Sequence, residues 1–206
     1  MKKVHIFDLD GTLADSMRAW TDGTVKLLDE AGIGNKDEII RAITPLGTKG
    51  AAEYLIKIGF KGTAEELLRS IEENMIYQYS YVIRLKRGAE TYINELWDKG
   101  DRLFVLTASP HRTTDVCLKN NGVFDLFERV FTIDDFGLFK SDTRIYDEAA
   151  ERIGVKNDEI TFYDDNIIAL EAAKKAGLHV VGVYDASSEG DAEKIKEITE
   201  KYLVWD

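Results

Sequence analysis

The chain has 206 residues, 44% of them hydrophobic, with a formal net charge of −11 and a pI near 4.8. This length and apolar content can form a sizeable core, as one domain or a domain with an insertion, and they disfavour disorder. The acidic charge disfavours nucleic acid and anionic membranes as partners, and the single cysteine, Cys117, excludes an internal disulfide. With no signal-peptide pattern and no apolar run of membrane-spanning length, we expect a cytoplasmic protein.

The first predicted strand ends in a pair of carboxylates. An apolar run over residues 4–7 stops at Asp8 and Asp10, and Gly11 then permits a sharp turn. Side chains alternate along a strand, so the two aspartates would share one face if the strand continued. Two like charges so close are costly without a cation or a shared proton, which favours a functional site over an ordinary turn.

Residues 15–87 form a block of predicted helices with no convincing strand. Apolar residues recur at spacings of three and four in four segments, at residues 20–31, 39–43, 52–58 and 67–82. Thr63 and Glu66 match a capping box at the start of the last segment, and the polar stretch 45–50 predicts a flexible loop. We interpret the block as an inserted helical subdomain.

From Gly88 onward, predicted strands alternate with predicted helices. Continuous apolar runs predict buried strands at residues 103–106, 130–133, 160–163 and 180–183. Helical segments are predicted at residues 92–97, 110–120, 143–153, 166–176 and 190–202. This alternation predicts an α/β core, built from residues 1–14 and 88–206, with a doubly wound and mostly parallel sheet.

The residues that follow each strand of such a sheet converge on one edge. Here they are mostly acidic or small hydroxyl residues, with one lysine: Asp8, Asp10, Thr107, Ala108, Ser109, Asp134, Asp135, Lys140, Asp164, Asp165 and Asn166. Paired carboxylates can hold Mg²⁺, and a metal-neutralised carboxylate can attack a phosphate while a second one exchanges protons. A lysine and backbone N–H groups can bind the transferring oxygens. The set is therefore complete for phosphoryl transfer.

These motifs resemble those of the haloacid dehalogenase-like hydrolase superfamily, in the same order and over nearly the whole chain. The stretch from Asp8 to Leu13, then Thr107, Lys140 and the pair Asp164–Asp165 stand where that family has its four motifs. The helical block at residues 15–87 resembles the cap of the phosphoglycolate phosphatase and β-phosphoglucomutase branch. The resemblance implies a Rossmann-like core with an inserted α-helical cap.

The resemblance also implies a role for each motif residue. Asp8 would be the nucleophile and Asp10 the general acid and base, with both also in the Mg²⁺ site. Asp165, helped by Asp164, would complete the metal site, and which of the two is the direct ligand stays open. The phosphoryl group would be held by Thr107, Ala108, Lys140, Gly11 and Thr12. The chain departs from the family where Ser141 replaces the usual proline after the lysine and where Asp164 replaces a common glycine.

Several nearby residues have a simpler structural interpretation. Ser109 before Pro110 predicts a helix N-cap with proline at the first helical position. Asp134 and Asp135 are expected to be loop carboxylates that either have a structural role or support the site residues. His111 could approach the site from the helix start. Thr48 and Lys49, in the predicted loop of the cap, are weak candidates for substrate selection.

The sequence therefore predicts a Mg²⁺-dependent phosphatase that hydrolyses a small phosphorylated metabolite through an aspartyl-phosphate. A phosphomutase of the same family is the nearest alternative, and a receiver-like module that binds phosphate or Mg²⁺ without catalysis is a more distant one. A haloacid dehalogenase is disfavoured because it does not need Asp10. We expect a monomer, with a homodimer as the alternative.

Overall fold

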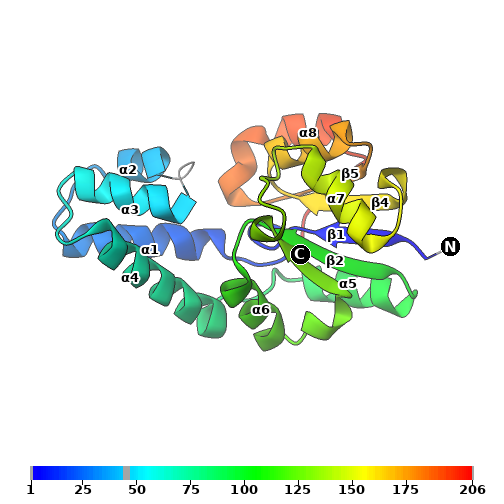
Figure 1. Cartoon of the computed structure of the whole chain (residues 1–206), viewed down its shortest axis with the longest axis horizontal. Coiled ribbons are helices and arrows are strands. Elements are labelled where there is room, and N and C mark those ends of the chain that lie inside the picture. Colours follow the sequence, from blue (N-terminus) through cyan, green and yellow to red (C-terminus); the bar gives the residue numbers. More distant parts are fainter. Residues whose placement is uncertain (1, 44–46, 206) are drawn as a thin grey trace. The chain divides into compact units, whose positions relative to one another are not determined.

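The computed structural model of the chain describes residues 2–43 and 47–205, and the side chains of residues 41 and 47–49 lie outside that description. The chain divides into two compact units (Figure 1). We call Met1–Ser16 together with Ile83–Asp206 the α/β unit, and Met17–Val82 the helical unit. The boundaries predicted from the sequence lie at residues 14 and 87.

The α/β unit is built on a six-stranded sheet in the order β3-β2-β1-β4-β5-β6, in which every neighbouring pair is parallel. The strands are β1 Val4–Phe7, β2 Arg102–Thr107, β3 Arg129–Thr132, β4 Ile160–Asp164, β5 His179–Val183 and β6 Lys201–Leu203. The α-helices are α5 Ala89–Asp98, α6 His111–Asn120, α7 Arg144–Ile153, α8 Ile167–Lys175 and α9 Ala192–Ile198. Short 3-10 segments are η3 Phe124–Leu126, η4 Ile133–Asp135, η5 Asn157–Glu159 and η6 Ala186–Asp191. The predicted α/β class with a mostly parallel sheet is confirmed.

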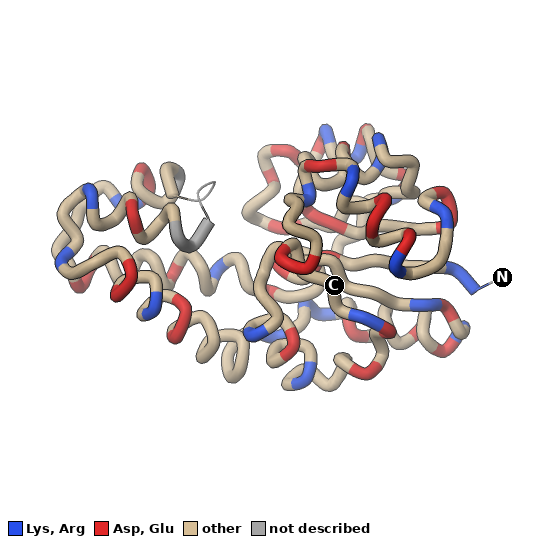
Figure 2. Tube along the Cα trace, viewed as in Figure 1, with Lys and Arg blue, Asp and Glu red and all other residues tan. Residues whose placement is uncertain are grey.

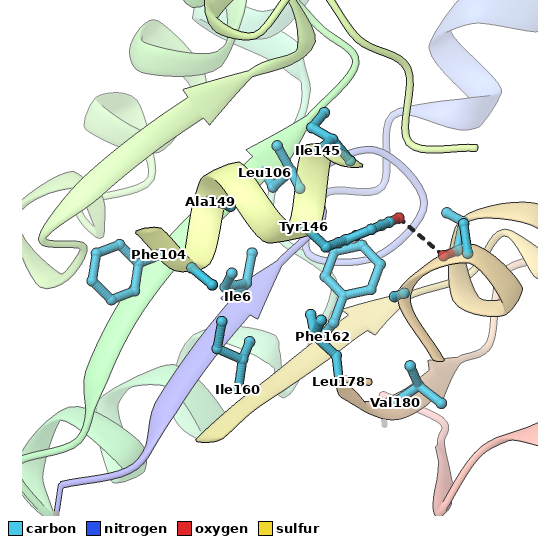
Figure 3. Packing of buried hydrophobic residues seen from close by; sticks show 14 of the residues in the cluster. Ile6, Phe104, Leu106, Ile145, Tyr146, Ala149, Ile160, Phe162, Leu178 and Val180 are labelled. Carbon is cyan, nitrogen blue, oxygen red and sulfur yellow. Dashed lines mark hydrogen bonds between the residues drawn. The ribbon is translucent and has the colours of Figure 1, made fainter. Parts of the chain in front are cut away.

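Helices cover both faces of this sheet because its strands are apolar on both sides. Ile6 of β1 joins the core beneath α7 and α8, where Tyr146 packs edge-on against Phe162 with ring centroids 5.2 Å apart (Figure 3). The next residue, Phe7, points to the opposite face and contacts Tyr92 of α5. Burial on both faces fixes the register of the central strands, and with it the position of the residues at their ends.

The helical unit contains α1 Met17–Glu30, α2 Lys36–Ile43, α3 Gly47–Lys57 and α4 Ala64–Tyr77, which continues into the π-helical segment η2 Gln78–Val82. Its core consists of apolar residues from all four α-helices: Leu28, Ile39, Ile43, Ala52, Leu55 and Leu67. The predicted capping box of Thr63 and Glu66 is present at the start of α4, in both directions. The unit thus has an apolar core of its own.

Two predicted elements were wrong. Residues 47–50, predicted as part of a loop, form the first turn of α3, because packing of this helix against α4 outweighs the low helix propensity of two glycines. The predicted helix at 190–202 ends at Ile198, and residues Lys201–Leu203 form β6 instead. The helical spacing of Ile195, Ile198 and Tyr202 favours a helix. Residues 201–203 instead pair with β5, with Leu203 opposite Val183, and the spacing of apolar residues does not reveal this pairing.

Acidic and basic residues are interspersed along both units (Figure 2). Because the chain is acidic overall, an anionic ligand needs local cations. Among the residues that the structure describes, no helix has both the length and the apolar character needed to cross a membrane.

Candidate active site

The strand order brings the ends of β1 and β4 together at the centre of the sheet. From β1 the sheet grows to one side through β2 and β3, and to the other through β4, β5 and β6. Ligands of open α/β sheets bind at such a reversal, beyond the carboxyl ends of the strands. The Asp8 N–H donates to the carbonyl oxygen of Tyr163 at 2.9 Å, so residues just after β1 lie beside those that end β4. Asp8 is thereby placed next to Asp164 and Asp165.

Three buried carboxylates meet there. Asp8, Asp164 and Asp165 each offer one oxygen, and these oxygens all lie within 4.8 Å of one another. Lys140, from the loop between β3 and α7, donates to Asp8 Oδ1 at 2.6 Å and to Asp164 Oδ2 at 2.7 Å. The structure therefore joins residues that lie 132 and 24 positions away from Lys140 in the sequence. We call these four residues the acidic cluster.

The charges of the acidic cluster do not balance within these four residues when all three carboxylates are ionised. Burial above all raises the pKa of Asp8 well above its usual range, against the opposing effect of Lys140. Burial, followed by the charge of Asp164, raises the pKa of Asp165 to about 7. Although burial opposes it, the charges of Asp164 and Asp8 raise the pKa of Lys140, which stays protonated. With all three carboxylates ionised, one ammonium leaves an excess of two negative charges, which a divalent cation would neutralise, and the raised pKa values show that protons compete for the same place.

The donor chemistry of the cluster fits such a cation. All three ligand candidates are carboxylate oxygens, which hard divalent ions such as Mg²⁺ prefer. Their mutual repulsion in a buried setting is relieved by a cation or a proton. Asp8, Asp164 and Asp165 could therefore hold a metal ion. The carboxylate of Asp10, the fourth predicted metal residue, is not among these three.

Asp10 is instead held by two serine hydroxyls. Ser16 Oγ donates to Asp10 Oδ1 and Ser109 Oγ donates to Asp10 Oδ2, each at 2.6 Å. The predicted N-cap role of Ser109 is wrong, because Pro110 occupies that position without a side-chain cap bond. The Ser109 N–H also donates to Thr107 Oγ1 at 3.1 Å, so Ser109 contacts both Thr107 and Asp10. For Ser109, its position after a predicted strand was the sequence signal for a place at the site. No sequence signal indicated that Ser16 contacts Asp10.

Gly11 and Thr12 pack directly against Asp165. Gly11 has φ +80°, and a Cβ added there would lie 2.8 Å from both carboxylate oxygens of Asp165. Thr12 Oγ1 donates to Asp165 Oδ1 at 3.0 Å, while the Gly11 N–H donates to the Ala14 carbonyl oxygen. The two residues thus form a close-fitting turn against the cluster, and their predicted contact with phosphate stays a prediction.

Thr107 and Ala108 lie at the carboxyl end of β2, the neighbour of β1 on the other side from β4. The Thr107 side chain is fully buried, whereas Ala108 is exposed. Because β2 pairs with β1, Thr107 lies at the same edge of the sheet as Asp8. Its position at the end of a predicted strand indicated this placement.

Tyr146 supports the loop that carries Lys140. Its buried hydroxyl lies 2.8 Å from the Lys140 carbonyl oxygen and 2.9 Å from that of Ala169 in α8, the second contact being the dashed line of Figure 3. One hydroxyl proton is thus shared between two carbonyls. This contact ties the Lys140 loop to the helix that follows Asp164 and Asp165.

The other predicted residues lie outside the cluster. The exposed Asp135 accepts hydrogen bonds from the Thr132 N–H and from His111, so its predicted structural role agrees with its contacts. Asp134 is exposed in the same loop. The side chains of Thr48 and Lys49 lie outside the described residues.

Comparison with known proteins identifies related sequences. The sequence model of the family described as haloacid dehalogenase-like hydrolase matches residues 5–183. The chain is 26% identical over 204 residues to validoxylamine A 7'-phosphate phosphatase of Streptomyces hygroscopicus subsp. limoneus, covering 97% of this chain and 96% of that protein. It is 28% identical to phosphoglycolate phosphatase of Rhodospirillum rubrum, covering 88% and 79% of the two chains.

A solved structure has the same fold. The crystal structure of CbbY from Rhodobacter sphaeroides in complex with phosphate superposes with a TM-score of 0.80 at 20% identity, over 98% of this chain and 94% of that one. At this identity the likeness concerns the fold.

Proposed function

The chain belongs to the haloacid dehalogenase-like hydrolase family, and from this premise we propose that it is a phosphatase of small phosphomonoesters. In this proposal the phosphoryl group passes through an aspartyl-phosphate on Asp8, and the metal cofactor is Mg²⁺. The relatives named as phosphatases, which match nearly the whole chain, support the reaction class.

The observation that carries the proposal is the position of Lys140 between Asp8 and Asp164. A carboxylate repels an anionic phosphate, so a nucleophilic Asp8 needs positive charge beside it. Lys140 supplies that charge at 2.6 Å, and full ionisation of the three carboxylates would leave two negative charges for a divalent cation to neutralise. When bound, the cation would offset the charge of the phosphoryl oxygens; Asp8 and Asp165 would hold it, with Asp164 and the Asp10 backbone carbonyl as further ligands.

The first half of the proposed reaction transfers the phosphoryl group to the protein. An oxygen of Asp8 attacks phosphorus, the bond from phosphorus to the alcohol oxygen breaks, and that oxygen takes a proton from Asp10. The hydroxyls of Ser16 and Ser109 hold Asp10 in one orientation for this transfer. Lys140 and Thr107 bind the phosphoryl oxygens.

The second half releases phosphate. Asp10, now a carboxylate, takes a proton from water, and the water oxygen attacks phosphorus. The bond from phosphorus to Asp8 breaks, which restores the free carboxylate of Asp8 and the protonated Asp10. The same two carboxyl groups thus serve both halves.

We also propose that the helical unit acts as a cap that selects the substrate, with Thr48 and Lys49 as candidate selecting residues. Replacing both with alanine is expected to change the ranking of substrates while hydrolysis of a generic aryl phosphate persists. An unchanged ranking would contradict this role.

The testing experiment measures phosphate release from sugar phosphates, phosphoglycolate, nucleotides and an aryl phosphate. Each compound is assayed with Mg²⁺, with a chelator, and with the variant Asp8→Asn. We expect release that needs Mg²⁺ and disappears in the variant. Release that is equal in wild type and Asp8→Asn contradicts the mechanism, and isomerisation of a sugar phosphate without net release would indicate a phosphomutase.

A further inference from the structure

A second largely buried cation, Lys86, contacts the turn that packs on Asp165. Lys86 follows the helical unit in the sequence, and its side chain is 12% exposed. Its ammonium pairs with Asp185 Oδ2 at 2.8 Å, donates to the Tyr184 carbonyl oxygen at 2.7 Å and also donates to the Gly11 carbonyl oxygen. An ammonium has three protons, so these three acceptors use its full donor capacity.

The Gly11–Thr12 turn is thereby held through its carbonyl groups. The Gly11 carbonyl accepts from Lys86, and the Thr12 carbonyl accepts from Trp205 Nε1 at 2.8 Å. The Gly11 Cα and the Thr12 hydroxyl meanwhile lie against Asp165. A shift of the turn would therefore change the position of the Asp165 carboxylate.

The energetics of buried ion pairs favour a geometric role for Lys86. A buried pair seldom adds net stability, because desolvation offsets the attraction. Although burial opposes it, hydrogen bonds from Lys86 and Ser187 hold the pKa of Asp185 below its usual range, so the Asp185 carboxylate stays ionised. What this pair adds is a fixed anchor for the Gly11 carbonyl.

We propose that Lys86 is a positioning residue of the metal site, which anchors the Gly11–Thr12 turn against Asp165 and thereby sets that carboxylate for the cation. The inference rests on the proposed function in that it takes the acidic cluster to bind a divalent ion. Residues that orient metal ligands typically change metal affinity by about 10- to 100-fold when removed.

The test measures binding of Mn²⁺ to the full chain by electron paramagnetic resonance, with Mg²⁺ as competitor. We expect Lys86→Met to weaken Mn²⁺ binding by about tenfold or more. Lys99→Met removes a charge from the exposed end of α5 and is expected to bind Mn²⁺ as the wild type does. The KM for substrate at saturating metal is expected to stay within about twofold, because the three protons of the Lys86 ammonium are already taken by Asp185, Tyr184 and Gly11.

A double variant separates positioning from simple destabilisation. Lys86→Met leaves Asp185 buried without its cation, and adding Asp185→Asn removes that charge but does not restore the anchor of Gly11. We therefore expect the double variant to recover thermal stability while Mn²⁺ binding stays weak. Recovery of binding in the double variant, or wild-type binding in Lys86→Met, overturns the inference.

Phosphate release measured in parallel distinguishes the two proposals. If the wild type releases phosphate and Lys86→Met binds Mn²⁺ as tightly as the wild type, only the proposed role of Lys86 is overturned. A wild-type chain that binds no Mn²⁺ and releases no phosphate overturns the proposed function as well.

Discussion

The Lys140 ammonium lies 2.6 Å from the Asp8 carboxylate, across 132 residues of sequence, and both side chains are largely buried. A second carboxylate, Asp164, contacts the same ammonium at 2.7 Å. Asp8, the candidate nucleophile, is therefore already paired with the Lys140 ammonium before substrate binds. This pair, more than any one motif residue, defines the candidate active site.

Replacing Lys140 with methionine is expected to lower activity by at least about 100-fold, because it removes positive charge from the place where phosphoryl oxygens gather. It also leaves Asp8 and Asp164 without their cation, a loss that costs about 3–5 kcal/mol of unfolding free energy for a buried pair. Mg²⁺ should restore part of this stability. Urea unfolding with and without Mg²⁺ measures the effect.

Lys175→Met, on the exposed side of α8, is the control for charge removal. Activity of Lys140→Met within about tenfold of the wild type would contradict the assigned role.

Ser109→Ala is expected to lower kcat by about 10- to 100-fold, because it removes a hydrogen bond to the charged form of Asp10, worth about 1.5–3 kcal/mol. The KM should change little, since Asp10 acts on the leaving oxygen in the transition state. Ser16→Ala removes the bond to the other oxygen of the same carboxylate and should act similarly. Steady-state kinetics of both variants test this, and a wild-type kcat in both would refute it.

Gly11→Ala is expected to abolish activity and weaken metal binding. The added Cβ would lie 2.8 Å from the Asp165 oxygens, in a backbone conformation with φ +80° that disfavours any side chain. Gly137→Ala is the matched control, since Gly137 has φ +63° but no atom within 4 Å of an added Cβ.

The control variant isolates the backbone cost, about 1–2 kcal/mol for a residue in the left-handed region. Thermal unfolding and phosphate release of both variants are compared. Equal losses of activity in the two variants would show that contact with Asp165 is not the cause.

His111 is expected to make stability depend on pH. Although partial burial opposes it, hydrogen bonds to Asp115 and Asp135 raise the pKa of His111 above 6.5. Because the folded pKa lies above the unfolded one, the stabilisation is fully present below about pH 6.5 and is lost as the pH rises through the folded pKa.

The His111 side chain is 44% exposed, so solvent screening limits the effect to less than about 1 kcal/mol. Between about pH 6 and 8, His111→Gln should show a shallower fall of the unfolding free energy than the wild type. An NMR titration that places the His111 pKa below 6.5 would contradict this expectation.

The sequence by itself determined the α/β class and the residues gathered at the sheet edge. Buried parallel strands are continuous apolar runs, and residues after them converge on one edge whatever the strand order. Asp8, Thr107, Lys140 and Asp164 could therefore be placed together from local pattern alone. Chain order and spacing also carried the family resemblance, which the matching family model confirmed.

Only the tertiary structure decided which partner each side chain meets. Several hydrogen bonds join residues whose separation in sequence carries no periodic signal. They are the bonds from Ser16 and Ser109 to Asp10, from Tyr146 to the Lys140 carbonyl, and from Lys86 and Trp205 to the Gly11–Thr12 turn. The strand β6 escaped prediction for the same reason, since its pairing with β5 sets its conformation. Local spacing reflects which face of an element is buried, whereas hydrogen-bond partners depend on strand order and register, which arise only when the whole sheet packs.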